Sequence, residues 1–177
     1  AGEDIASNFF GQSSFATHCL TYERNVVKVP EGFPLELAGP LGCGIQTGAG
    51  GIMRSLACEA GSSLLILGGG AVGLSAVMGA AVRGCETIIV LEPHAERRKL
   101  ALELGATHVL DPAEAKDLAA AVRAILPIGV DYAFDTTALP ALLQATMGCL
   151  APHGTLGMFR IAPTGTPMPS HPLYALP

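Results

Sequence analysis

The stretch SLLILGGGAVG, residues 63–73, decides the fold. Its first five residues, SLLIL, form an apolar run of the kind that a strand buried on both faces of a parallel sheet shows. The next six, GGGAVG, match the spacing G-x-G-x-x-G. That spacing is informative where a strand precedes it and a helix follows, because this is the setting of a dinucleotide-binding turn. The stretch therefore predicts a strand, a phosphate-binding turn and a helix.

Each fixed position of this spacing, the first, third and sixth, requires glycine for a different physical reason. Gly68 permits the tight turn, Gly70 lets a pyrophosphate approach the backbone, and Gly73 lets the helix pack closely on the strand. The helix that begins at Ala71 and Val72 offers free N–H groups and the positive end of its dipole to the phosphates. We therefore predict that all five residues contact a dinucleotide cofactor; a glycine-rich turn without a ligand is the alternative.

An acidic residue follows at the spacing that such a site requires. Glu92 ends the apolar run TIIVL at 87–91 and lies 19 residues beyond Gly73. An acid about 20 residues on is expected to accept hydrogen bonds from the adenosine ribose hydroxyls. A carboxylate there would repel a 2′-phosphate, so NAD is favoured over NADP. Arg97 and Arg98 follow closely and could accommodate a phosphate if the loop folds back.

The region after residue 62 alternates apolar runs with helix-length segments. Strands are expected at 64–67, 87–91, 108–110, 130–134 and 155–159. A helix expected near 93–104 has proline at its first position and Gly105 just past its end. Leu118, Val122 and Ile125 form one apolar stripe at helical spacing. The alternation predicts an α/β fold: a Rossmann-type doubly wound parallel sheet with helices on both faces.

The first third of the chain has a different sequence pattern. Residues 8–30 show short extended signals, an alternation over 15–22 and the run VVKVP at 26–30, and predict two short strands, which are too few to build a core. We therefore expect this piece to belong to a sheet completed elsewhere. Residues 34–61 have helical tendency but are rich in glycine, and Gly61 is the expected helix stop.

Composition excludes several classes of protein. Of 177 residues, 50% are hydrophobic and 14% charged, and the formal net charge is −5. This excludes a disordered chain and a basic nucleic-acid-binding domain. No apolar run approaches the roughly 18 residues of a membrane-spanning helix, and the acidic start AGED is no signal peptide. Five cysteines without a C-x-x-C pair indicate free thiols. We expect a soluble cytoplasmic protein without nucleic-acid or membrane partners.

Further motifs resemble those of one enzyme family. The segments FFGQSSFA at 9–16, LGCGIQTGAG at 41–50 and LGAT at 104–107 accompany the glycine turn and Glu92 in the order found in zinc-dependent medium-chain alcohol dehydrogenases. The first of them is similar to the aryl (benzyl) alcohol dehydrogenase branch. The resemblance implies an oxidoreductase that transfers hydride between an alcohol or aldehyde, here an aryl one, and NAD.

The resemblance also implies roles for individual residues. Cys43 would be one of three protein ligands of a catalytic zinc, and Thr47 would lie beside the nicotinamide. The remaining positions are Val72 behind the nicotinamide ring, Arg97 near the adenosine ribose, and Thr136 and Thr137 at the adenine-side wall. The family's other two zinc ligands, a cysteine and a histidine in a Gly-His-Glu motif, are absent from this sequence. We therefore predict that the isolated chain is catalytically inert.

By the same resemblance, residues 1–33 are a fringe of a GroES-like catalytic domain, and residues 34–177 are the NAD-binding domain, truncated before its last strand. The full-length family members are expected to be homo-oligomers. Phe159 and Arg160 replace a smaller segment near the nicotinamide carboxamide, so they either point outward or alter that pocket. A zinc-free, quinone-reductase-like oxidoreductase and a non-enzymatic NAD(H)-binding module remain alternatives.

Overall fold

The computed structural model describes residues 17–159, and the chain divides into two compact units between Gly39 and Pro40. In residues 17–39 it has two turns of 3-10 helix, η2 (Glu23–Asn25) and η3 (Leu35–Leu37). This described part of the first unit contains no strand, and none of its residues is buried.

The two strands expected between residues 8 and 30 are therefore wrong from residue 17 onward; residues 8–16 lie outside the described part. A strand forms only beside another strand that completes its ladder of backbone hydrogen bonds. The described residues of the first unit contain no such neighbour. The extended signals of the sequence were thus not enough to make a strand here.

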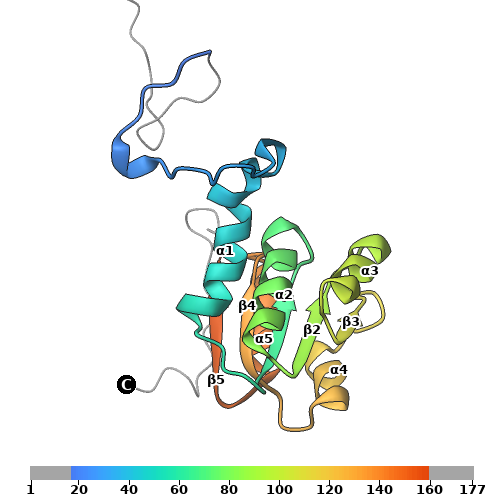
Figure 1. Cartoon of the computed structure of the whole chain (residues 1–177). Helices are drawn as coiled ribbons and strands as arrows, with labels where there is room; N and C mark the ends of the chain where they lie inside the picture. The colour runs from blue at the N-terminus through green and yellow to red at the C-terminus, as the bar shows by residue number, and fades with distance from the viewer. Residues whose placement is uncertain (1–16, 160–177) are drawn as a thin grey trace, which may run out of the picture. The chain divides into compact units, whose positions relative to one another are not determined.

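A five-stranded parallel sheet forms the centre of the second unit (Figure 1). Its strands are β1 (Ser63–Leu67), β2 (Thr87–Leu91), β3 (His108–Leu110), β4 (Val130–Asp135) and β5 (Leu150–Met158). Their order is β3-β2-β1-β4-β5, and every pairing is parallel. This is the strand order of the Rossmann fold through its fifth strand. The fold class predicted from the sequence is confirmed.

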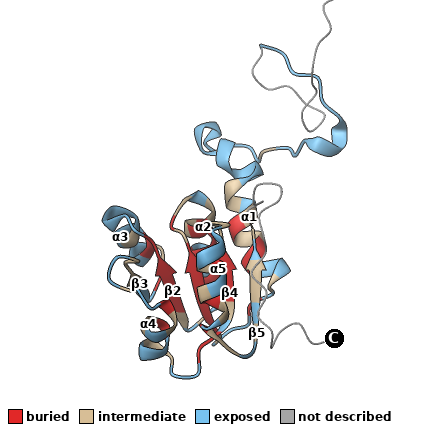
Figure 2. Ribbon diagram, turned by 180° about the vertical axis from the view of Figure 1, so that it is seen from behind, coloured by how far each residue is buried: buried red, intermediate tan, exposed pale blue. Residues whose placement is uncertain are grey.

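Helices cover both faces of this sheet. They are α1 (Gly44–Gly50), which follows the 3-10 turn η4 (Gly39–Gly42) and continues into the π-helical turn η5 (Gly51–Ser55), then α2 (Ala71–Arg83), α3 (Ala95–Glu103), α4 (Leu118–Ile125) and α5 (Pro140–Met147). Alternate residues of the central strands divide between two apolar clusters. Leu64 and Ile66 pack with α2, whereas Leu65 and Leu67 pack with α4. Buried residues therefore concentrate in β1, β2 and β4 (Figure 2).

Several element boundaries differ from the prediction. The helix α3 begins at Ala95 with His94 as its N-cap, so Pro93 precedes the cap and is not at the first helical position. The helix of the glycine-rich segment ends at Ser55, because Ala57 takes a left-handed φ of +50°. Gly61, expected as its stop, has a φ of +80° in the turn before β1 instead. The last described strand begins at Leu150, five residues before the predicted start, and its pairing with β4 is irregular between Val130 and Tyr132.

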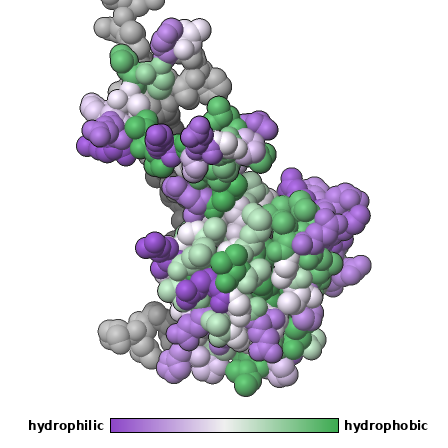
Figure 3. Space-filling view, in the orientation of Figure 1, coloured by the Kyte–Doolittle hydropathy of each residue, from purple (hydrophilic) through white to green (hydrophobic). Residues whose placement is uncertain are grey.

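The outer surface is polar over α3, whose sequence AERRKLALE carries most of its charges outward (Figure 3). Gly105 follows this helix with a φ of +117°, as its predicted stop position requires. In residues 17–159, every helix is too short or too polar to cross a lipid bilayer.

Candidate functional site

The glycine loop turns the chain from β1 into α2. Gly68 has a φ of +96°, in the left-handed region that glycine adopts without strain. Its N–H donates to the carbonyl of Leu91 at 2.9 Å, which ties the loop to the end of β2. A Cβ at Gly73 would overlap the carbonyl oxygen of Gly68. The backbone geometry therefore demands glycine at both positions.

Gly70 differs from these two because the space beside it is open. It is the N-cap of α2, with a φ of −79° and a ψ of −171°, a conformation open to any residue. A Cβ built there would meet nothing within 4 Å. The first N–H groups of α2, at Ala71, Val72 and Gly73, have no acceptor inside the helix. Open space thus adjoins a helix N-terminus, which is a place where phosphates bind.

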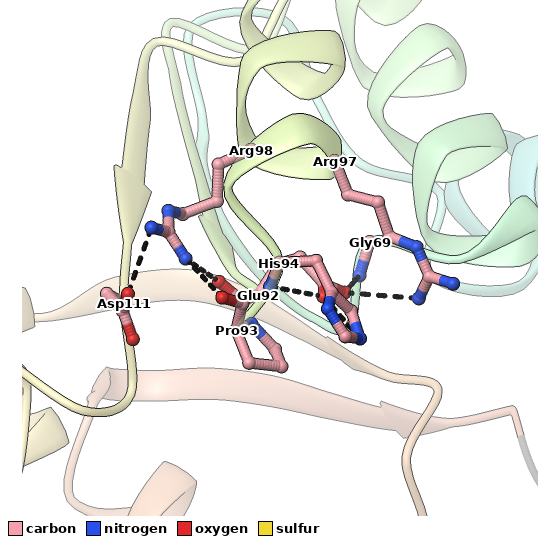
Figure 4. Close-up of polar contacts among 7 residues, drawn as sticks. All are labelled: Gly69, Glu92, Pro93, His94, Arg97, Arg98 and Asp111. Carbon is pink, nitrogen blue, oxygen red and sulfur yellow. Dashed lines mark hydrogen bonds and ion pairs between the residues drawn. The ribbon is translucent and has the colours of Figure 1, made fainter.

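Glu92, at the carboxyl end of β2, is almost fully buried, with 3% of its surface exposed. Its Oε2 accepts a hydrogen bond from the N–H of Gly69 at 2.7 Å, and its Oε1 accepts one from the N–H of His94 at 2.9 Å (Figure 4). A carboxylate has about four acceptor positions, so two remain for a ligand. The side chain therefore links the glycine loop to the loop after β2.

The side chains of an arginine and a histidine lie near this carboxylate. Arg97 Nη1 is 3.9 Å from Glu92 Oε2, and His94 Nε2 is 4.0 Å from Oε1. Both side chains are more than half exposed, so water screens these pairs. Arg98 points elsewhere: its Nη2 pairs with Asp111 Oδ2 at 2.9 Å, and its Nη1 donates to two carbonyls of the β2–α3 loop (Figure 4). Of the two arginines, only Arg97 lines the site.

The loop after β4 forms the opposite wall. The N–H and Oγ1 of Thr136 both donate to the carbonyl of Leu67, at 3.1 and 2.8 Å. Asp135 is fully buried; its Oδ1 accepts from the N–H and Oγ1 of Thr137, and its Oδ2 accepts from the N–H of Ala138. The acid thus acts as a cap at the end of the strand.

These loops surround a pocket of about 580 Å³. Six of the predicted cofactor-binding residues line it: Gly68, Gly70, Glu92, Arg97, Thr136 and Thr137. The other three, Ala71, Val72 and Gly73, form the adjoining first turn of α2. The pocket lies beyond the carboxyl ends of β1 and β4, where the strand order reverses. Open α/β sheets bind their ligands at this kind of position.

Cys43 and Thr47 belong to α1. Cys43 is its N-cap and an exposed free thiol, and the N–H of Thr47 donates to the Cys43 carbonyl at 2.8 Å. Within residues 17–159, no three histidine, cysteine, aspartate or glutamate side chains are grouped so that they could hold a metal ion. A catalytic zinc site uses three protein ligands. The described residues therefore do not make a zinc site by themselves.

Small residues hold α1 directly on α2. Gly48 is buried, and a Cβ there would overlap the carbonyl oxygen of Val72 and lie 2.7 Å from the Cβ of Ser75. One helical turn further along α2, a Cβ at Gly79 would lie 3.0 Å from the Cα of Ala49. The helix α1, which Cys43 caps, therefore packs against α2 from Val72 to Gly79.

Phe159 points inward rather than outward. Its ring stacks on that of Phe134, with centroids 4.2 Å apart and 21° between the planes. A Cβ at Gly51 would lie 2.9 Å from the Phe159 ring, so the ring fills the space under η5. Arg160 lies outside the described residues.

Some residues of the site carried no sequence signal. The N–H of Gly69 is a backbone donor and leaves no side-chain pattern, and His94 lies outside the G-x-G-x-x-G and acid spacing. The apolar lining residues Pro112, Leu139 and Leu142 come from loops after β3 and β4 and from α5. Among the site residues that the sequence analysis did not name, only Asp135 had a usable signal, namely an acid at a strand end followed by two threonines.

The parallel strand order, the glycine turn and the buried acid after β2 define a dinucleotide-binding domain of the Rossmann class. A family model described as zinc-binding dehydrogenase matches residues 71–176. The chain therefore belongs to the zinc-binding dehydrogenase family, and the resemblance to zinc-dependent alcohol dehydrogenases is confirmed.

Relatives with more specific names support this assignment. The chain is 51% identical to a geraniol dehydrogenase of Castellaniella defragrans, over 96% of this chain and 46% of that protein. It is 41% identical to the solved benzyl alcohol dehydrogenase of Acinetobacter calcoaceticus, with a TM-score of 0.87, over 92% of this chain and 44% of the other. A zinc-binding dehydrogenase structure from Sinorhizobium meliloti, bound to NADP, is 27% identical, with a TM-score of 0.67, over 74% of this chain and 39% of the other. The chain thus spans about half the length of the relatives that it matches.

Proposed function

We propose that this chain is the NAD-binding domain of a zinc-dependent alcohol dehydrogenase, and that the pocket beside the glycine loop binds NAD. The observation that carries the proposal is the buried carboxylate of Glu92, which lines the same pocket as the open face of Gly70. A dinucleotide needs both features, an acceptor for ribose hydroxyls and an uncrowded backbone for the pyrophosphate.

The residues of the pocket fit such a cofactor. Glu92 would accept hydrogen bonds from the adenosine ribose, and the N-terminus of α2 would receive the pyrophosphate. Thr136 and Thr137 would form the adenine-side wall, and Arg97 would lie near the ribose. Val72 would pack behind the nicotinamide and Thr47 beside it, as in the family. The bound nicotinamide supplies the redox chemistry by accepting or donating a hydride, while these residues hold and orient it.

The charges around the pocket favour NAD over NADP. A 2′-phosphate would lie against the Glu92 carboxylate, which both adjacent loops hold in place. Arg97 offers one exposed counter-charge, and Arg98 is already paired with Asp111. Like charges placed together at a binding site cost several kcal/mol, which one screened arginine offsets only in part. The Sinorhizobium meliloti structure was solved bound to NADP, which makes this preference worth a direct test.

The test is calorimetric titration of the chain with NADH and with NADPH, because a chain without tryptophan is a poor reporter for fluorescence transfer. NADH is expected to bind more tightly by on the order of tenfold or more, since one charge repulsion of about 1.4 kcal/mol already gives that ratio. Glu92→Gln is expected to reduce the ratio, because it removes the charge and nearly keeps the size.

The matched control is Glu96→Gln, the same charge change on the exposed first turn of α3. It is expected to leave the ratio of the two affinities unchanged. Melting temperatures of both variants show whether lost binding reflects lost structure. Equal or tighter binding of NADPH by the unaltered chain would disprove the NAD assignment, and binding of neither would disprove the pocket assignment.

For the substrate, we propose aryl alcohols and aldehydes. The support is the name of one solved neighbour, a benzyl alcohol dehydrogenase, and the similarity of geraniol dehydrogenase, whose name denotes another primary alcohol. Family resemblance further supports a catalytic-domain fringe at residues 1–33, an NAD-binding domain at residues 34–177, and homo-oligomers. The five free cysteines favour a reducing compartment such as the cytoplasm.

For the metal, we propose that Cys43 donates one thiolate and that the family's other two ligands, which this sequence does not contain, complete the site. The 177-residue chain is then expected to retain no stoichiometric zinc in equilibrium dialysis, and to oxidise no alcohol with added zinc and NAD. Cys43→Ser is expected to behave in the same way. One zinc held by the unaltered chain and lost in this variant would contradict the prediction.

A further inference from the structure

Two cysteines lie near the amino-terminal ends of β1 and β2. This end of the sheet is opposite the cofactor pocket. Cys58 belongs to the loop before β1, and Cys85 follows the last turn of α2. Hydrogen bonds hold the two segments side by side. Arg83 Nε donates to the Cys58 carbonyl at 2.7 Å, and the N–H of Gly61 donates to the Gly84 carbonyl at 2.7 Å. The N–H of Cys58 is itself bound to the main chain, at the carbonyl of Ile52.

The two thiols share one environment. Cys58 is fully buried in the apolar cluster on the α2 face of the sheet, and half-buried Cys85 packs against the same cluster. The sulfur of Cys85 is 3.6 Å from Ser62 Oγ and 3.9 Å from the carbonyl of Glu59, the residue that follows Cys58. Burial raises the pKa of Cys58 to about 12, and the neighbouring Cys85 thiol adds to this shift by charge repulsion and by a hydrogen bond.

We propose that Cys58 and Cys85 are a modification site: a dithiol that a small disulfide oxidant, such as oxidised glutathione, converts to an intramolecular disulfide. The more exposed Cys85 loses its proton and attacks the oxidant's disulfide, which forms a mixed disulfide and releases one glutathione. Cys58 then loses its proton and attacks the Cys85 sulfur, which releases the second glutathione. Two thiols are oxidised, one glutathione disulfide is reduced, and both protons pass to the released thiolates.

The order of these steps follows from burial. Cys85 reaches solvent and meets the oxidant first, whereas Cys58 can react only with a sulfur already beside it. Because the pKa of Cys58 is raised to about 12, little of it is thiolate at neutral pH, so closure is the slow step. The mixed disulfide at Cys85 is therefore expected to appear before the bond between Cys85 and Cys58.

The bond would close segment 58–85, which contains β1, the glycine loop and α2. Closing a long segment removes conformations from the unfolded chain and so stabilises the fold. The cofactor pocket lies at the other ends of the same strands, beyond Leu67 and Leu91. The oxidised chain is therefore expected to be harder to unfold and to bind NADH like the reduced chain.

The experiment incubates the chain with oxidised glutathione, alkylates the remaining thiols and maps peptides by mass spectrometry without reduction. We expect a peptide pair linked through Cys58 and Cys85 and a higher Tm, both reversed by dithiothreitol. Cys85→Ser is expected to lose both effects. Cys149→Ser, which removes a buried thiol whose pKa burial raises to about 11, is expected to keep them.

The other exposed thiols, Cys19 and Cys43, are expected to carry single glutathiones in every variant and serve as the internal measure of oxidant exposure. Cys85 that stays glutathionylated beside an alkylated Cys58 would overturn the proposal. So would a linked pair without a rise in Tm, because the bond would then distort the fold it is expected to stabilise. NADH titration before and after oxidation reports separately on the cofactor pocket, so its failure is distinguishable from failure of the dithiol.

Discussion

Gly48→Ala is expected to destabilise the chain, whereas Gly50→Ala, two residues further along the same helix, is expected to stabilise it. A Cβ at Gly48 would overlap the carbonyl oxygen of Val72 and crowd the Cβ of Ser75, both in α2. Overpacking of this kind costs roughly 1–3 kcal/mol. A Cβ at Gly50 would meet nothing within 4 Å, so alanine there adds only its better helix propensity, about 0.5–1 kcal/mol.

Thermal unfolding of the two variants measures this difference. The Tm of Gly48→Ala should fall and that of Gly50→Ala should rise, by about 2–4 °C for each kcal/mol in a chain of this size. A rise in both would show that α1 does not pack on α2 as described. The functional consequence is specific to Gly48: when α1 is forced away from the start of α2, Cys43 and Thr47 move with it. NADH affinity is therefore expected to fall in Gly48→Ala alone.

The strands of the sheet could be predicted because each is a short apolar run with clear limits, as with TIIVL at 87–91, where prediction and structure agree residue for residue. Residues 17–30 also gave strand signals, the alternation up to residue 22 and the run VVKVP at 26–30, and yet form no strand. The difference lies in tertiary context: β2 has neighbours on both sides, whereas the described part of the first unit contains no strand to pair with.

The site was predictable where a residue type and a spacing sufficed, as for Glu92 and the glycines. It was not predictable where the role of a residue depends on contact with another element of the fold. Arg97 and Arg98 are adjacent in sequence, but Asp111 at the end of β3 draws Arg98 away from the pocket. Their different roles depend on the pairing of β2 with β3, which no local pattern encodes. The same holds for Phe159, whose orientation depends on the space left by Gly51.

Gly70→Val is expected to weaken NADH binding strongly while leaving the fold almost intact. The backbone of Gly70 is extended, valine adopts that conformation readily, and the side chain would point into open space. The cost to stability is therefore limited to a poorer N-cap, about 1 kcal/mol or less. In the proposed complex this open space holds the pyrophosphate, so a branched side chain there excludes the cofactor and the affinity should fall by on the order of a hundredfold, about 2.7 kcal/mol.

Gly73→Ala provides the contrast. Its Cβ would overlap the carbonyl oxygen of Gly68, so we expect both a lower Tm, by an overpacking cost of roughly 1–3 kcal/mol, and weaker NADH binding. Titration calorimetry and thermal unfolding of the two variants therefore separate a glycine kept for the ligand from a glycine kept for the fold. If Gly70→Val bound NADH like the unaltered chain, the pyrophosphate would not pass over Gly70. Glu92 and the α2 N-terminus would still line the same pocket, so the cofactor would then take a different path through it.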